Sequence, residues 1–184
     1  MRFPLSYATE KTYNGNLEGM VLSRLCPIIV GFLLLALAGC QNGKLNPTGT
    51  SFPGVSEVEI ASFNLLNQDR REQGLPELAF DSQVAAVARR HSEDMRDRNY
   101  FAHTNPDGKT FSDRLRDAGI PFQTSGENLV TTSNIPDPAG YANTGFLNHA
   151  EHRAIIMSST FTRVGVGVAR SGDSYWITQD FVGP

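Results

Sequence analysis

The sequence predicts an α+β sandwich, and two patterns along the chain indicate this class. Helical periodicity dominates the first half of the predicted domain, residues 56–119. Strand-like alternation of apolar and polar residues comes last, in residues 164–168 and 175–181. Because helices and strands are separated along the chain, their order favours an α+β fold over repeated βαβ units.

Residues 1–40 are expected to be a targeting segment rather than part of the fold. Residues 1–19 are polar without helical or strand period, and we expect translation to begin at Met20. Arg24 supplies a positive flank to the apolar run 28–36, which is shorter than the roughly 20 apolar residues needed to span a bilayer. The run is therefore typical of a signal peptide, with an N-terminal anchor helix as the alternative.

The signal-like run ends in Leu-Ala-Gly-Cys, which resembles a bacterial lipobox. The resemblance implies cleavage before Cys40 and diacylation of its thiol by chains such as palmitate. Acyl chains anchor a protein because each buried methylene contributes about 0.8 kcal/mol. Gln41 follows in place of aspartate, which by the same resemblance favours the outer membrane in a Gram-negative cell. Residues 41–55, rich in small and polar residues, are predicted to be a flexible tether to a domain at residues 56–184.

The overall composition excludes some classes of function. The chain has 184 residues, a formal net charge of −3 and no basic tract, so we expect no nucleic-acid binding. Its two cysteines, Cys26 and Cys40, both precede the predicted domain, which therefore has no internal disulfide. An exported domain of this kind depends on packing alone for its stability.

Two helices are predicted before the first long loop. Ser56 with Glu59 three residues later forms a capping box that opens the first helix, and Gly74 ends it. Asp81 caps the second helix. The expected inward faces of the two helices are Ile60, Phe63 and Leu66, then Val84, Ala88, His91 and Met95. For the histidine on this buried stripe, a hydrogen-bonded core role is favoured over a role in a site.

A loop and a short third helix follow the second helix. Residues 101–108 contain the sequence Pro-Asp-Gly, which is typical of a turn. Thr110 caps the third helix, and Gly119 ends it. Its inward residues are predicted to be Phe111, Leu115 and Ala118. Its arginines are expected to be solvated or paired with its aspartates: Arg114, Arg116, Asp113 and Asp117.

The last part of the chain is predicted to end in a hairpin. A β-leaning stretch, a weakly helical stretch and a group of core residues precede it at 129–132, 139–148 and 155–157. The alternating segments 164–168 and 175–181 form the antiparallel hairpin, with its turn at 171–174. Glycines between the valines of the first segment imply that another element packs closely on that face.

Short motifs spread over nearly all of residues 56–181 carry a family resemblance. They are His91-Ser92-Glu93-Asp94-Met95, Phe101-Ala102-His103, Pro106-Asp107-Gly108, Arg114-Leu115 with Ala118-Gly119, Gly126-Glu127-Asn128-Leu129, His152-Arg153, and Phe161 before Gly165-Val166-Gly167. In this order they resemble the CAP superfamily (SCP domain), which comprises cysteine-rich secretory proteins, antigen 5 and plant pathogenesis-related proteins. The match is best with its bacterial branch without disulfides.

The resemblance implies a fold and a cleft. The family fold is a three-layer α-β-α sandwich with a central mixed, mainly antiparallel sheet. Many members line a cleft with two histidines and two glutamates. By that resemblance His103, Glu127 and His152 take three of these places. His149 stands where the second glutamate falls, so the chain departs from the full set of four.

The cleft residues carry donor atoms that suit a divalent metal. Imidazole nitrogen and carboxylate oxygen are the usual zinc ligands, and His149 and His152 share one face if their segment is helical. With His103 they offer three nitrogens, and Glu127 offers an oxygen or a partner that orients a histidine. The order is neither the His-Glu-x-x-His of zincins nor its inverse. A buried polar network without metal is the alternative.

Two classes of function follow from these features. The first is a lipid-anchored module of the cell envelope that binds a lipid, a cell-wall glycan or another envelope protein, with a cleft that binds zinc weakly. The second is a metal-dependent hydrolase that cleaves peptide or glycan in the envelope. The sequence favours the binding module because no nucleophile can be paired with a general base. Ser92 directly follows His91, and adjacent helical residues do not face each other.

Overall fold

The computed structural model describes residues 52–184. The signal-like run, the lipidation site at Cys40 and most of the tether lie outside the described residues and stay predictions. Within the described part, helices and strands combine in an α+β fold, as the sequence predicts. In this part of the chain, none of the helices has the length and apolar character that crossing a bilayer requires.

Within residues 52–184, the centre of the fold is a four-stranded sheet in the order β1-β3-β4-β2. The strands are β1 (Ala79–Phe80), β2 (Thr124–Ser133), β3 (Arg163–Ser171) and β4 (Ser174–Gly183). β1 runs parallel to β3, whereas β3 with β4 and β4 with β2 are antiparallel, so the sheet is mixed and mainly antiparallel. β3 and β4 form the predicted hairpin, and β2 extends well beyond the stretch 129–132 that the sequence indicates.

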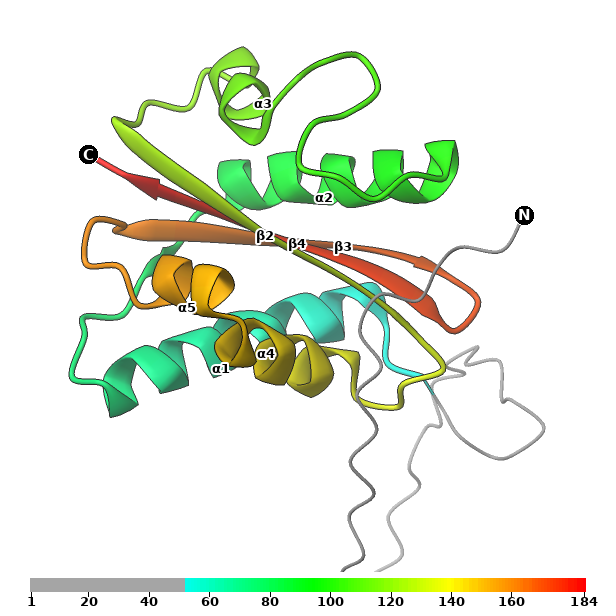
Figure 1. The fold of residues 1–184 in the computed structure, drawn as a ribbon, viewed down its shortest axis with the longest axis horizontal. Coiled ribbons are helices and arrows are strands. Elements are labelled where there is room, and N and C mark those ends of the chain that lie inside the picture. The colour runs from blue at the N-terminus through cyan, green and yellow to red at the C-terminus, as the bar shows by residue number, and fades with distance from the viewer. Residues whose placement is uncertain (1–51) are drawn as a thin grey trace, which may run out of the picture. The chain divides into compact units, whose positions relative to one another are not determined.

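Helices cover both faces of this sheet. They are α1 (Val55–Glu72), α2 (Ser82–Arg98), α3 (Phe111–Asp117), α4 (Pro138–Asn148) and α5 (Ala150–Ile156). Figure 1 shows α2 and α3 on one face of the sheet and α1, α4 and α5 on the other. This is the three-layer α-β-α sandwich that the family resemblance implies.

The face of the sheet toward α1, α4 and α5 holds the main apolar core. Side chains alternate along a strand, so one side of β3 and of β4 can be mainly apolar, with the buried Gln179 as a polar exception on β4. The buried members of this core are Val58, Leu66, Leu78, Ala139, Ala142, Phe146, Ile156, Phe161, Val164, Val166, Val168, Tyr175, Ile177 and Phe181. Burial of this apolar surface supplies the stability that a domain without disulfides needs.

The opposite face of the sheet lies directly against the backbone of α2. A Cβ atom added at Gly165 would lie 2.1 Å from the backbone nitrogen of Ala85, and one at Gly167 would lie 1.9 Å from that of Arg89. The close packing predicted for these glycines is therefore confirmed. A smaller apolar cluster fills the rest of this layer: Val84, Val87, Leu115, Ile120 and Val182.

The start of α1 differs from the prediction. Gly54, not Ser56, is the N-cap residue, and its backbone N–H donates to the Glu57 carboxylate at 2.8 Å. Ser56 with Glu59 and Gly54 with Glu57 both have the three-residue spacing of a capping box, so the spacing alone does not show which pair begins the helix. Glu59 is instead buried, where it accepts hydrogen bonds from Arg89 at 2.7 and 2.8 Å. Ile60, predicted to face inward, is 62% exposed.

The other helix signals are confirmed with one exception. The Asp81 carboxylate caps α2 by accepting the backbone N–H of Val84 at 3.2 Å. The Thr110 hydroxyl caps α3 by accepting that of Asp113 at 3.3 Å. The exception is Ala118, which is predicted to face inward but is exposed just after α3.

Candidate functional site

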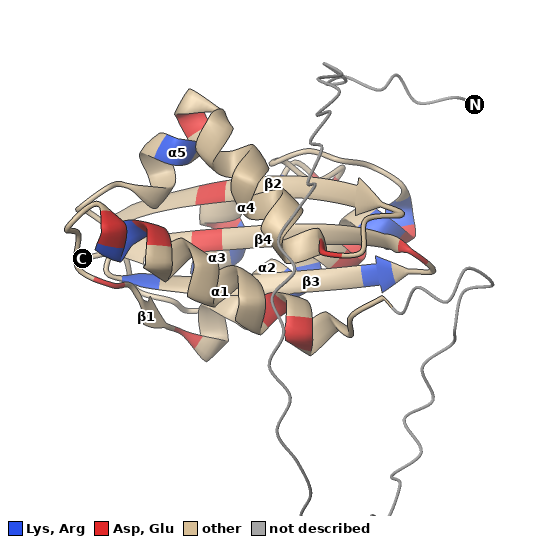
Figure 2. Cartoon of the chain, turned by 90° about the horizontal axis from the view of Figure 1, so that it is seen from below, with Lys and Arg blue, Asp and Glu red and all other residues tan. Residues whose placement is uncertain are grey.

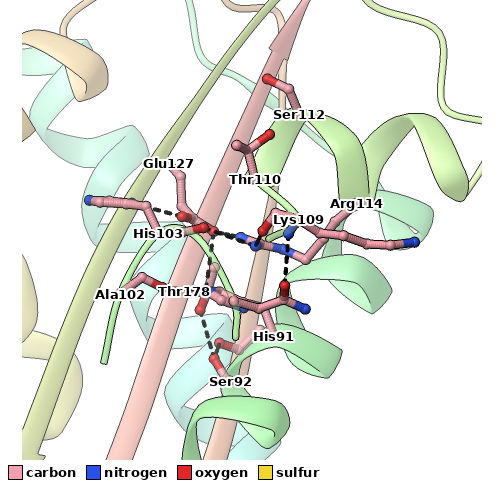
Figure 3. Close-up of polar contacts among 12 residues, drawn as sticks. His91, Ser92, Ala102, His103, Lys109, Thr110, Ser112, Arg114, Glu127 and Thr178 are labelled. Carbon is pink, nitrogen blue, oxygen red and sulfur yellow. Dashed lines mark hydrogen bonds and ion pairs between the residues drawn. The ribbon is translucent and has the colours of Figure 1, made fainter. Parts of the chain in front are cut away.

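A half-exposed histidine and a buried glutamate form the centre of the candidate site. His103 lies on the loop between α2 and α3, and Glu127 lies on β2, the edge strand of the sheet. The imidazole Nδ1 is 2.7 Å from the Glu127 Oε1 (Figure 3). The His103 side chain is 51% exposed, whereas the Glu127 side chain is fully buried. Because an ionised carboxylate can only accept, Nδ1 donates to it, and in the neutral ring Nε2 is then the hydrogen-bond acceptor.

Local turn chemistry holds the loop that carries His103. The Asn105 side-chain oxygen accepts the backbone N–H groups of Asp107 at 3.1 Å and Lys109 at 2.8 Å. Gly108 has φ +82°, a left-handed conformation that glycine adopts without steric cost. The predicted Pro-Asp-Gly turn is therefore confirmed, and it fixes the distance between His103 and α3.

Arg114 of α3 ties this loop to the glutamate. Its Nη2 donates to the Glu127 Oε2 at 2.5 Å, and its Nη1 donates to the carbonyl oxygens of His103 at 2.9 Å and Lys109 at 3.2 Å. The expectation of a solvated Arg114 or one paired with the helix aspartates is wrong. Arg116 does pair with Asp113, at 3.4 Å. A guanidinium suits the Arg114 position because its planar fork binds a carboxylate and neighbouring carbonyls together.

His91 closes the site from the side of α2. Its ring is almost fully buried, its Nε2 lies 3.1 Å from the carbonyl oxygen of Ala102, and the same nitrogen is 3.8 Å from the Glu127 Oε2. Burial lowers the pKa of His91 below its ordinary value, which favours the neutral ring. The core role favoured from the sequence is confirmed, and His91 also supports the loop backbone next to His103.

Asp180 is a buried acid that the sequence analysis missed. It lies on β4 directly opposite Glu127, and Figure 2 shows the acidic positions of β2 and β4 side by side. The side chain is inaccessible to solvent, and burial, with the charge of Glu127, raises the pKa of Asp180 well above its ordinary range. Within residues 52–184, neither carboxyl oxygen meets a protein donor. A proton retained on Asp180 is what lets the two carboxyl groups lie together.

His149 and His152 lie where α4 meets α5. Their ring centroids are 5.8 Å apart, and the His152 ring meets Phe146 edge to face at 5.3 Å. Burial first, then the charges of His149 and His103, lowers the pKa of His152. His103 comes from the loop between α2 and α3, whereas His152 belongs to α5 on the other face of the sheet (Figure 1). His103 thus contacts Glu127 directly, and the ring of His149 contacts the ring of His152.

The same residues do not fit a zinc site in this arrangement. Among residues 52–184, no group of three or more His, Cys, Asp or Glu side chains is placed to hold a metal ion. One oxygen of Glu127 faces His103 and the other faces Arg114, so a metal would have to displace one of them. Weak zinc binding stays a prediction that titration can test.

The fold and the site together define a class of protein. It is an α-β-α sandwich in which a buried glutamate on the edge strand orients a surface histidine. Residues 63–181 match the model of the cysteine-rich secretory protein family, CAP, and the chain belongs to that family.

Two curated relatives are from Bacillus subtilis (strain 168). The chain is 36% identical over 140 residues to "Uncharacterized protein YkwD", a match that covers 76% of this chain and 52% of the relative. It is 38% identical over 127 residues to "Uncharacterized membrane protein YlbC", covering 69% of this chain and 34% of the relative. The chain thus spans about half and about a third of the lengths of these relatives.

Solved structures show the same fold. An extracellular protein containing a SCP domain from Bacillus anthracis str. Ames is 35% identical, with a TM-score of 0.64 over 78% of this chain and 45% of that chain. An outer surface protein from Borrelia burgdorferi is 16% identical, with a TM-score of 0.63 over 69% of this chain and 92% of that chain. At that identity the second likeness concerns the fold alone.

Proposed function

We propose that this chain is a lipid-anchored binding module of a bacterial cell envelope that presents the His103 imidazole to a ligand on the extracytoplasmic side. The observation that carries the proposal is the double contact on Glu127. One carboxylate oxygen faces His103 Nδ1 at 2.7 Å and the other accepts from Arg114 at 2.5 Å. The half-exposed side chain of His103 is thereby held by the buried carboxylate of Glu127, which the nearly buried guanidinium of Arg114 holds in turn.

Such a site suits recognition because its geometry exists before the ligand arrives. An imidazole held through Nδ1 loses little further freedom when a ligand binds, which reduces the entropic cost of association. Its Nε2 accepts a hydrogen bond from a hydroxyl or amide group. A cell-wall glycan carries many such donors, so we propose it as the ligand ahead of a lipid or another envelope protein.

The alternative, a metal-dependent hydrolase of peptide or glycan, has less support. An imidazole oriented by a carboxylate is also how a general base is held, which is the observation in its favour. The nearest serine in the motifs is engaged elsewhere: Ser92 is buried and donates to the carbonyl oxygen of Gly167 at 2.9 Å. Arg114 occupies the oxygen of Glu127 that a metal would need.

Location outside the cytoplasm is supported by the sequence and by a relative. A cysteine at position 40 ends a signal-like apolar run, as expected of a lipoprotein precursor. The Bacillus anthracis relative is described as an extracellular protein. Metabolic labelling with a palmitate analogue tests the anchor: we expect label on the wild-type chain and none on Cys40→Ser. Equal labelling of both would remove the lipid anchor from the proposal.

Cosedimentation of the detergent-solubilised full chain with purified cell-wall sacculi tests the binding role. We expect His103→Gln to weaken binding about tenfold, the cost of one well-placed hydrogen bond. Arg71→Gln is the matched control, because Arg71 pairs with Glu77 on the exposed surface of a different layer. Equal binding by wild type and His103→Gln would contradict the proposal. Zinc-dependent release of soluble wall fragments would establish the hydrolase instead.

A further inference from the structure

A cavity lies between α2, α3 and the loop that joins them. Its volume is about 370 Å³, within the range of roughly 300–1,000 Å³ usual for small-molecule sites. Its lining residues are Val87, Arg90, His91, Asp94, Asn105, Lys109, Arg114, Asp117 and Ala118. His103, Glu127, His149 and His152 do not line it. It lies beside the imidazole site described above and shares His91 and Arg114 with it.

The cavity is polar because of the way α2 is oriented. Val87, Arg90, His91 and Asp94 follow the spacing i, i+3, i+4, i+7, so they form one face of α2. The apolar face of the same helix lies on the sheet, through residues such as Val84 and Ala88. Val87 of this face belongs to the same apolar cluster as Leu115 of α3, whereas the other three residues of the face are polar and border the cavity.

The two acids of the lining are already neutralised. The Asp94 carboxylate accepts a hydrogen bond from the Tyr100 hydroxyl at 2.5 Å and lies 3.4 Å from an Arg98 nitrogen. Asp117 is paired with the ammonium group of Lys109. Neither acid therefore requires a cation from a ligand.

Two arginines of the lining keep donors without acceptors. Arg114 uses its two terminal nitrogens on Glu127 and on loop carbonyls, but its buried Nε meets no acceptor in the part of the chain described. Arg90 is exposed, and within residues 52–184 its guanidinium has no ion pair or hydrogen bond. Arg90 and Arg114 both line the cavity and both carry a positive charge, so the complementary ligand atom is an anionic oxygen.

We propose that this cavity binds the oxyanion group, carboxylate or phosphate, of a small polar molecule. The planar fork of Arg90 matches the two oxygens of such a group, and the Arg114 guanidinium, which lines the same cavity, adds positive charge. Val87 and Ala118 offer the apolar surface against which the rest of a small molecule packs. The site does not depend on His103, so it stands or falls separately from the proposed glycan binding.

NMR spectra of the arginine Nε–Hε groups of the detergent-solubilised full chain test this site. The probes are N-acetylglycine for a carboxylate, glycerol 1-phosphate for a phosphate, and N-acetylglycinamide as the uncharged control. We expect at least one anion to shift the signals of Arg90 and Arg114 saturably, and the amide to leave them unchanged. The anion that binds more tightly identifies the chemical class.

Variants separate a built site from general charge attraction. Arg90→Gln is expected to weaken the anion about tenfold, and Arg90→Lys, which keeps the charge and loses the fork, by a smaller factor. Arg153→Gln, an exposed arginine bordering a different cavity, is expected to leave the affinity unchanged. Arg90 is exposed, so its replacement leaves the fold intact, which a thermal melt verifies. Unchanged affinity in Arg90→Gln, or no saturable shift with either anion, would overturn the proposal.

Discussion

The two faces of the central sheet are built in opposite ways. Toward α1, α4 and α5, β4 presents large apolar groups such as Tyr175 and Ile177, which pack in the main core. Toward α2, the neighbouring positions are Thr178 and Asp180, beside glycines of β3. The first, thick face is mainly apolar, and the second, thin face holds buried polar groups beside a smaller apolar cluster.

This difference explains where a site can form. On the thin face, some buried polar groups have partners: the Ser92 hydroxyl lies 2.8 Å from that of Thr178 and donates to the Gly167 carbonyl oxygen. The thick face supplies stability by burial of apolar surface, so the thin face can hold charges such as Glu127. The layer toward α1, α4 and α5 thus supplies most of the apolar burial, and the layer toward α2 holds the buried charges of the site.

The largest expected effect comes from adding a side-chain atom to a glycine of the thin face. A methyl group at Gly167 would meet the α2 backbone at 1.9 Å, and backbone cannot rotate away as a side chain can. We expect Gly167→Ala to cost about 4 kcal/mol or more of unfolding free energy in urea titrations. Gly145→Ala is the control, because nothing lies within 4 Å there, and we expect it to stabilise by about 1 kcal/mol. Similar stabilities of the two variants would refute the thin-face description.

The next effect comes from breaking the buried charge pair. Glu127→Gln leaves Arg114 without its carboxylate, and we expect a loss of about 3 kcal/mol of unfolding free energy. The double variant with Arg114→Met removes both charges together, so it should cost clearly less than the sum of the single variants. Additive losses in this double-mutant cycle would show that the two side chains do not depend on each other.

Acid should weaken the fold through the buried imidazole of His91 and the half-buried imidazole of His152. The folded-state pKa of His91 and of His152 is lowered by burial, so below about pH 6.5 the unfolded chain binds protons that the folded chain refuses. The stability from these groups is complete above that pH and is lost as pH falls through the folded-state pKa values. We expect His152→Gln to flatten the slope of unfolding free energy between pH 7 and 5 in urea titrations. An unchanged slope would contradict the burial of His152.

The buried carboxyl on the thin face should give the opposite sign. Because the pKa of Asp180 is raised, the stability from its protonated form is present below its unfolded value of 3.8 and is lost as pH rises through its folded-state pKa. The Asp180→Asn variant does not suffer this loss. Its unfolding free energy relative to that of the wild type should therefore increase with pH. Relative to wild type, the unfolding free energy of Asp180→Asn should rise with pH and that of His152→Gln should fall. Urea titrations over one range of pH therefore distinguish the two groups.

Zinc should have the smallest effect of these perturbations. Because Arg114 occupies one oxygen of Glu127, we expect wild-type affinity no tighter than about 10 µM by calorimetry. Arg114→Met frees that oxygen and should raise the affinity about tenfold. Submicromolar binding to the wild type, lost in His103→Ala and His152→Ala, would show that a metal displaces Arg114.

Much of the fold could be predicted because its signals are local. Asp81 and Thr110 act on backbone groups within three residues, and the hairpin follows from alternation on either side of a turn. Ile60 is exposed although its helical spacing predicts an inward position, because the same spacing also occurs at the edge of an apolar face. Local patterns therefore identify elements better than they identify which side of an element is buried.

The site was less predictable because its contacts join distant segments. The placing of His103, Glu127 and His152 came from the family resemblance rather than from periodicity. The partnership of Arg114 with Glu127 depends on the path of a whole loop, which no spacing reveals. The placing of Asp180 requires the register of β4 against β2, which the alternation of residues 175–181 does not give.

The central claim is that Glu127 holds the His103 ring with its proton on Nδ1, so that Nε2 faces the ligand. The most direct test is a two-bond ¹H–¹⁵N correlation spectrum of the histidines at about pH 8, where a free imidazole is neutral. We predict that His103 is found in the Nδ1–H form in the wild type and returns to the mixture of a free histidine in Glu127→Gln. A His103 ring with its proton on Nε2 in the wild type, or an unchanged signal in Glu127→Gln, would contradict the account.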